Sequence, residues 1–177
     1  MAAYEIHTHE FPPLYDENSR ILILGSFPSV KSREQQFYYG HPQNRFWRIM
    51  AAVTGEPVPE TVEEKKRLVL SRGIALWDVI DSCEIRGSSD SSIRNAVPTD
   101  LPVILAGSRI GKIYTNGKLA YRLYARYQFP GTGIEAVPLP STSPANAAWS
   151  FERLLESWQA VREGIMPGTE KESCSLQ

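Results

Sequence analysis

The chain contains an uninterrupted apolar run, Ile21-Leu22-Ile23-Leu24, that ends at Gly25. A strand with apolar side chains at every position has to be covered on both faces, which is typical of a parallel sheet lying between helices. A strand with one solvent-facing side would alternate apolar and polar residues instead. The run therefore predicts the first central strand of a buried parallel sheet.

More apolar runs follow, and segments with helical spacing separate them. Strands that alternate with helices of about ten residues imply right-handed crossovers and a parallel sheet with both faces covered. The sequence therefore predicts an α/β fold, a three-layer α/β/α sandwich with a central parallel sheet of four to five strands. Further strands are expected over residues 73–80 (ending near Trp77), 101–107 and 112–117, and helices over 61–72, 118–127 and 147–163.

Length and composition limit the number of domains. A chain of 177 residues with 42% apolar content can bury one core but not two comfortable ones. Residues 1–165 are therefore expected to form a single α/β domain. Residues 166–177 are mostly polar and include Pro and Gly, so we expect a disordered C-terminal tail there.

Charge and cysteine content give little indication of a partner. The 19 basic and 20 acidic residues give a formal charge of −1, so binding to a polyanion would depend on local clusters of charge. The two cysteines, Cys83 and Cys174, support neither a disulfide framework nor a metal cage and favour a reducing, intracellular setting. The N-terminus lacks a basic start with an apolar core, and no apolar run approaches spanning length. A cytoplasmic protein without membrane contact is expected.

Two loops far apart in the sequence have the character of active-site loops. Gly25-Ser26-Phe27-Pro28-Ser29 directly follows the first strand, and residues 140–146, Pro-Ser-Thr-Ser-Pro-Ala-Asn, directly precede a predicted helix. Because the carboxyl ends of parallel strands meet at one edge of a sheet, loops this far apart can face each other across a single crevice. The sequence therefore predicts one pocket between these two loops.

A third segment, residues 37–48, is dense in aromatic, amide and cationic side chains. Such a mixture suits a flat ring held by stacking and by hydrogen bonds to its edge. The alternative is an ordinary loop whose Phe46 and Trp47 anchor the following helix in the core, since buried aromatic residues are common.

Four segments together, residues 25–29, 39–47, 115–118 and 140–146, resemble the uracil-DNA glycosylase superfamily, and within it the hypoxanthine-DNA (deoxyinosine) glycosylase branch. The resemblance covers residues 18–162 in the order of the superfamily. It implies a monofunctional enzyme that flips deoxyinosine out of DNA and hydrolytically excises hypoxanthine, initiating base excision repair. It also implies a monomer that acts on double-stranded or single-stranded DNA containing a deaminated base and needs no metal or organic cofactor.

The resemblance points to Asn44 as the catalytic residue. Most of the superfamily has an acidic or amide residue at the third position of the first loop, where it orients the attacking water, but this chain has Phe27. An aromatic ring cannot polarise water. Asn44 offers a carbonyl acceptor and an amide donor without burying a charge. The other reading of Asn44 is a helix N-cap, a position that asparagine favours.

Several residues are expected to bind the flipped base. Asp78 stands at the end of a strand where the superfamily often has an asparagine that reads the base edge, and an ionised carboxylate would favour a base that presents N–H, such as N1–H of hypoxanthine. Asp78 could also simply order its own loop, Gly25 could serve a tight turn, and His41 could be only a hydrogen-bonding element. The full set is Gly25, Ser26, Phe27, Tyr38, His41, Phe46, Asp78 and Asn116.

The second loop resembles the superfamily's minor-groove loop, which presses into the duplex when a nucleotide flips out. Its hydroxyl and backbone N–H groups can bind phosphates, and Ala145 stands where a wedge residue belongs, which suggests weak plugging of the emptied stack. The residues expected to contact DNA are Ser29, Ser141, Thr142, Ser143, Pro144, Ala145 and Asn146.

Three other functions remain open from the sequence. A glycosylase for mispaired uracil would use the same pocket, although Phe27 argues against efficient uracil release. A non-catalytic relative would bind nucleic acid with salt-dependent affinity and never release a base. A small-molecule α/β enzyme unrelated to DNA would carry no basic surface around the two loops.

Overall fold

The computed structural model describes residues 3–86 and 90–165. Its centre is strand β2 (Ile21–Gly25), in which every residue is buried. Side chains of a strand point alternately to the two faces of a sheet. Ile21 and Ile23 accordingly belong to one core cluster, whereas Leu22 and Leu24 belong to another. The predicted central strand and its double-sided burial are confirmed.

Four strands form the parallel sheet, in the order β3-β2-β6-β7. β3 (Ile74–Asp78) pairs with β2 in a register that places Asp78 beside Gly25. β6 (Lys112–Asn116) pairs with the other side of β2 and with β7 (Ala136–Leu139). The neighbours of β2 therefore come from well-separated parts of the chain, so that the carboxyl end of β2 is a topological switch point, where wound α/β sheets form their ligand sites.

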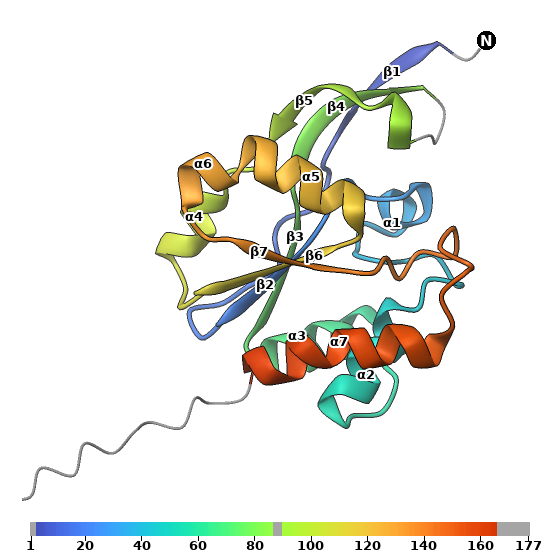
Figure 1. Ribbon diagram of the computed structural model, residues 1–177, viewed down its shortest axis with the longest axis vertical. Helices are drawn as coiled ribbons and strands as arrows, with labels where there is room; N and C mark the ends of the chain where they lie inside the picture. The colour runs from blue at the N-terminus through green and yellow to red at the C-terminus, as the bar shows by residue number, and fades with distance from the viewer. Residues whose placement is uncertain (1–2, 87–89, 166–177) are drawn as a thin grey trace, which may run out of the picture.

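Helices cover both faces of this sheet (Figure 1). On one face lie α2 (Phe46–Thr54), α3 (Val62–Ser71) and α7 (Phe151–Ile165), whose buried residues join the Ile21 cluster. On the other face lie α4 (Leu101–Ala106) and α5 (Lys118–Tyr127), followed by the single-turn α6 (Phe129–Thr132). The predicted three-layer α/β/α architecture is confirmed, and the short α1 (Val30–Gln35) lies beyond the end of β2.

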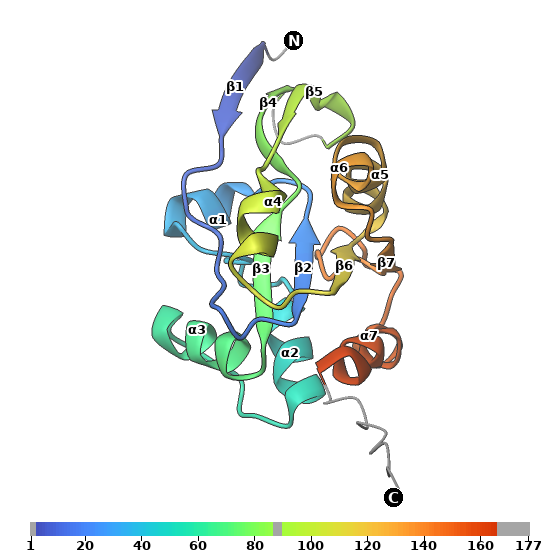
Figure 2. The same cartoon turned by 90° about the vertical axis from the view of Figure 1, so that its left-hand side faces the viewer.

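A second, antiparallel sheet extends from the carboxyl end of β3 (Figure 2). Its order is β1-β4-β5, formed by β1 (Tyr4–Thr8), β4 (Ile80–Arg86) and β5 (Arg94–Pro98), with the 3-10 turn η1 (Asp90–Ser92) between the last two. Just after β1, the backbone N–H of His9 donates to the carbonyl of Asp81 at 2.6 Å. The N-terminal segment thereby reaches the carboxyl edge of the parallel sheet.

Two predicted elements differ in the structure. The strand expected over residues 101–107 is wrong, because this segment is helix α4. Pro102 lies in the first helical turn, where a missing N–H is tolerated, whereas a central strand would need that donor. The helix expected from residue 147 begins at Phe151, because the Ser150 hydroxyl caps the N–H of Arg153.

Some expectations concern residues outside the described part of the chain. The predicted tail, residues 166–177, and Cys174 within it lie outside the described residues. In residues 3–86 and 90–165, no helix is long and apolar enough to span a membrane.

Candidate active site

A pocket of about 410 Å³ opens at the carboxyl ends of β2, β3 and β6, within the size range of small-ligand sites. The loop after β2, the segment before α2, the start of α5 and the loop after β7 surround it, so the two predicted loops do face each other. The predicted site residues that line it are Gly25, Ser26, Phe27, Ser29, Tyr38, Asn44, Asp78, Asn116, Ser141, Thr142, Ser143 and Ala145.

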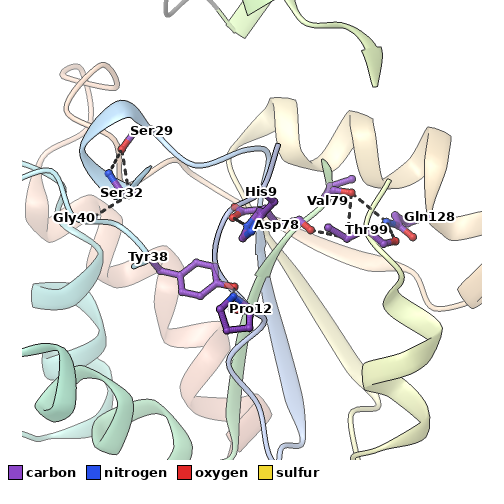
Figure 3. A network of polar contacts seen from close by, with 10 residues as sticks. All are labelled: His9, Pro12, Ser29, Ser32, Tyr38, Gly40, Asp78, Val79, Thr99 and Gln128. Carbon is purple, nitrogen blue, oxygen red and sulfur yellow. Dashed lines mark hydrogen bonds and ion pairs between the residues drawn. The ribbon is translucent and has the colours of Figure 1, made fainter. Parts of the chain in front are cut away.

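Asp78 and His9 form a buried polar pair at this pocket (Figure 3). Nε2 of His9 lies 2.7 Å from Oδ2 of Asp78, and the two side chains are only 2% and 6% exposed. A carbon atom added at Gly25 would stand 2.3 Å from Oδ1 of Asp78. The absence of a side chain at Gly25 is therefore what lets the carboxylate approach the end of β2.

Two tyrosines flank Asp78. Burial, and next the charge of Asp78, raise the pKa of both Tyr38 and Tyr39 well above the usual value, so both hydroxyls stay protonated at neutral pH. Tyr38 donates to the carbonyl of Pro12 at 3.0 Å. The Tyr39 hydroxyl is fully buried near the Asn116 amide but makes no hydrogen bond of normal geometry. Its hydrogen-bonding capacity is unused within the described residues, in a side chain that lines the pocket.

A hydrogen-bond network holds the amide of Asn44. Its Oδ1 accepts from the N–H of Phe46 at 2.9 Å and from the hydroxyl of Thr142 at 2.8 Å. The Asn116 amide binds the same threonine twice, donating to its hydroxyl at 3.0 Å and accepting from its N–H at 3.0 Å. Asn44 is not the N-cap residue of α2, which is Arg45, but from one position earlier it binds the N–H of Phe46, the first residue of the helix. The two donors fix its amide plane with Nδ2 as its remaining polar atom.

Arg45 fastens the loop after β7 to the Asn44 segment. Its guanidinium donates to the carbonyls of Ser143 at 3.2 Å and Asn146 at 3.1 Å, and also to that of Trp149. Its backbone N–H donates to the carbonyl of Thr142 at 3.1 Å. A single side chain therefore sets the shape of the loop opposite Asn44.

Two residues predicted to bind the base, Phe46 and His41, are placed differently from the expectation. Phe46 is fully buried in the core and stacks on Tyr39 at a centroid distance of 3.9 Å, so it offers no face to a base. His41 does not line the pocket, and its Nδ1 accepts from the N–H of Gln43. Pro144 and Asn146, predicted to contact DNA and not the base, lie outside the pocket lining, and their contact with DNA stays a prediction.

Thr142 lines the pocket but is poorly placed for the phosphate contact expected of it. The residue is fully buried, and its hydroxyl and N–H are both used within the network of Asn44 and Asn116. Ser141, Ser143 and Ala145 line the pocket and, unlike Thr142, are at least partly exposed.

Sequence reasoning missed three residues: His9, Tyr39 and Arg45. His9 lies 69 positions before Asp78, in a segment without a local motif. Tyr39 has a φ of 53°, an uncommon left-handed conformation for a tyrosine that the sequence does not indicate. Arg45 lies in the segment 39–47 that resembles the superfamily, but nothing in its neighbours shows that its partners lie about a hundred residues away.

We expect Gly25→Ala to destabilise the protein by about 1–3 kcal/mol, because the new methyl group would overlap the Asp78 carboxylate that His9 holds in place. Chemical denaturation measures this free energy. Gly111→Ala is the matched control, since a carbon atom there meets nothing within 4 Å. Equal stability of the two variants would show that the close approach of Asp78 to Gly25 is not maintained in solution.

Tyr39→Phe is expected to raise stability by about 1 kcal/mol, because it removes a buried hydroxyl that has no partner. If a bound ligand reaches this hydroxyl, the same change should raise the dissociation constant of a polar ligand by roughly three- to tenfold, the effect of one lost hydrogen bond. Thermal unfolding tests the first expectation, and a loss of stability would contradict it.

The fold and the site define an α/β/α protein whose ligand pocket lies at the carboxyl edge of a parallel sheet. Within the described residues, no three His, Cys, Asp or Glu side chains come together as metal ligands. The profile of the Uracil DNA glycosylase superfamily matches residues 12–162, and the chain belongs to that superfamily.

Individual relatives are similar over different shares of the chain. A protein of Methanosarcina acetivorans named Hypoxanthine DNA glycosylase is 39% identical over 155 residues, 85% of this chain and 95% of the relative. A protein of the same name from Methanosarcina barkeri is 41% identical over 86 residues, 48% of this chain and 54% of the relative. The solution NMR structure of a candidate uracil DNA glycosylase from Methanosarcina acetivorans superposes with a TM-score of 0.78 at 36% identity, covering 91% of this chain and 99% of that one.

Proposed function

We propose that this protein is a monofunctional DNA glycosylase that hydrolytically excises hypoxanthine from deaminated DNA and so initiates base excision repair. The observation that carries the proposal is the pocket, which brings the amide of Asn44 and the carboxylate of Asp78 together at the switch point of the sheet. The similarity to a Hypoxanthine DNA glycosylase over most of both chains supports the same substrate.

The chemistry fits a site without a strong acid. Breaking the bond between deoxyribose C1′ and the base develops positive charge on the sugar and negative charge on the base. Fixed dipoles at each developing charge are usually the largest catalytic contribution. The Tyr39 hydroxyl and the backbone N–H groups at the start of α5, which has no side-chain cap, can stabilise the departing base.

Asn44 positions the attacking water in this proposal. Because its Oδ1 already accepts two hydrogen bonds, Nδ2 is the atom that can hold the water oxygen close to C1′. An oxocarbenium-like sugar is strongly electrophilic, so the water needs placement more than deprotonation. The half-buried Phe27 lines the pocket as the stacking surface for the flipped base, with the guanidinium carbon of Arg33 at 5.8 Å from its ring centroid.

DNA is bound at the mouth of this pocket, by a monomer. Arg33 and Lys118 line the pocket and supply positive charge for phosphates, although the chain as a whole carries −1. Ser29, Ser141 and Ser143 add hydroxyl groups from the two facing loops. Flipping costs a few kcal/mol and least where the base is mispaired or single-stranded, so both kinds of deaminated DNA are substrates.

The test uses oligonucleotide duplexes that carry one deoxyinosine, one deoxyuridine or neither. After incubation with the purified protein, strand cleavage is compared with and without alkali. Cleavage at deoxyinosine that requires alkali is the expected result, because a monofunctional enzyme leaves an intact abasic strand. Cleavage at deoxyuridine alone would transfer the assignment to uracil, and cleavage nowhere would leave a non-catalytic DNA-binding relative.

A further inference from the structure

The imidazole of His9 is enclosed by aromatic rings. Its ring centroid lies 4.5 Å from that of Phe11, 6.1 Å from Tyr38 and 6.3 Å from Phe27. Nδ1 is fully buried without a partner, so the hydrogen bond from Nε2 to Asp78 is the polar contact of this ring. A surrounding of low polarity strengthens such a bond.

This contact assigns different roles to the two oxygens of Asp78. Oδ2 is taken by His9, whereas Oδ1 lies beside Gly25 on the pocket lining and has no hydrogen-bond partner among the described residues. An ionised carboxylate only accepts hydrogen bonds, so Nε2 must carry the hydrogen. With Oδ2 bound to His9, Oδ1 is the carboxylate oxygen that faces the ligand as an acceptor.

The other polar groups around Asp78 cannot make the same selection. The hydroxyl of Tyr38 is directed to the carbonyl of Pro12 and the amide of Asn116 to Thr142, while the hydroxyl of Tyr39 can donate or accept, so none of them selects one kind of base edge. The cations that share the pocket lining, Arg33 and Lys118, only donate. Asp78 is thus the one acceptor-only group among these residues of the pocket.

We propose that His9 is a positioning residue that determines substrate specificity: it holds Asp78 so that Oδ1 accepts the N1–H of hypoxanthine and repels the N1 lone pair of adenine. The proposal rests on the proposed function and adds to it the means by which adenine is refused. It also explains why a segment before the parallel sheet folds back to the pocket, since that path is what delivers His9 to Asp78 (Figure 3).

Binding to DNA that cannot be cleaved tests this role separately from catalysis. The probes are duplexes carrying 2′-fluoro-arabino forms of deoxyinosine or deoxyadenosine, and a duplex carrying a tetrahydrofuran abasic site. His9→Leu should weaken binding to the deoxyinosine probe by roughly 10- to 100-fold, the effect of losing a hydrogen bond to a charged group. Binding to the abasic probe should not change, because that probe has no base. Parallel losses on both probes, or no loss on either, would overturn the proposal.

Two further variants separate positioning from general damage to the fold. His9→Gln restores an N–H donor and should recover most of the preference for deoxyinosine. Asp78→Asn, with its oxygen held by His9, would present an N–H to the pocket and should shift the preference from deoxyinosine towards deoxyadenosine by roughly 10- to 100-fold. An unchanged preference in Asp78→Asn would overturn the proposal even if His9→Leu did not fold. Ile6→Ala, at an exposed position of β1, is the control that should bind as the unmodified protein does.

The result for the unmodified protein distinguishes this proposal from the proposed function. If the protein releases no hypoxanthine and shows no preference for the deoxyinosine probe, the proposed function fails and the role of His9 fails with it. If the protein releases hypoxanthine while His9→Leu keeps the full preference over adenine, the role of His9 alone is wrong.

Discussion

Replacing Asn44 with alanine is expected to lower the single-turnover rate of hypoxanthine release by roughly 10²–10⁴-fold, the range seen when a positioned catalytic group is lost. Nδ2 of this residue is the atom that we place against the attacking water, and its amide plane is fixed by Phe46 and Thr142. Rates are measured with enzyme in excess over a deoxyinosine duplex. Affinity for abasic DNA should stay within a few-fold, because the loops that contact phosphate are unaffected.

Oδ1 of Asn44 also accepts from the N–H of Phe46 at the start of α2, so the variant will lose about 1 kcal/mol of stability for that reason alone. Asn44→Asp separates the two roles. Aspartate keeps an oxygen for the N–H of Phe46 but has no Nδ2–H, so it should restore stability and not activity. Full activity in Asn44→Asp would mean that the residue only binds the N–H of Phe46 at the start of α2 and that water is positioned elsewhere.

Arg45→Ala should lower kcat/KM by roughly 10²-fold or more, because a displacement of about 1 Å in a supporting segment can cost that much. The guanidinium binds three backbone carbonyls of the loop that faces Asn44, and without it the loop and the Asn44 network lose their common anchor. Steady-state kinetics on the deoxyinosine duplex, together with proteolysis of the loop, measure both effects.

Arg45→Lys should recover little of this loss, since one ammonium group cannot reproduce the fork that reaches several carbonyls. Arg48→Ala is the matched control, an exposed arginine one turn further along α2. If Arg45→Ala and Arg48→Ala behave alike, the anchoring role assigned to Arg45 is wrong.

The parallel sheet could be predicted because its signals are local. The run at β2 shows double-sided burial directly, and α5 has the bounds that its spacing predicts, Lys118–Tyr127. The antiparallel sheet gave no such signal, since β1 and β5 are short and mostly exposed and lack an apolar pattern. Helix α4 does not match the predicted strand because a short run of five apolar residues suits either element, and Pro102 is the residue that distinguishes the two.

The site residues also fall into two groups, those with a local sequence signal and those placed by contacts distant in the sequence. Residues that end a strand, such as Gly25, Asp78 and Asn116, could be predicted because parallel strands end at one edge of the sheet. His9 and Arg45 could not, because their roles come from contacts 69 to 104 positions away. Phe46 shows the opposite error: an aromatic residue within a promising motif packs in the core instead of facing the pocket.

The decisive measurement is the identity of the base set free. A duplex with a single deoxyinosine is incubated with the unmodified protein and with Asn44→Ala, and the free bases are quantified by mass spectrometry. We expect hypoxanthine from the unmodified protein, in proportion to the abasic sites formed, and little or none from Asn44→Ala. Absence of free hypoxanthine with the unmodified protein, or equal release by both proteins, would contradict the account.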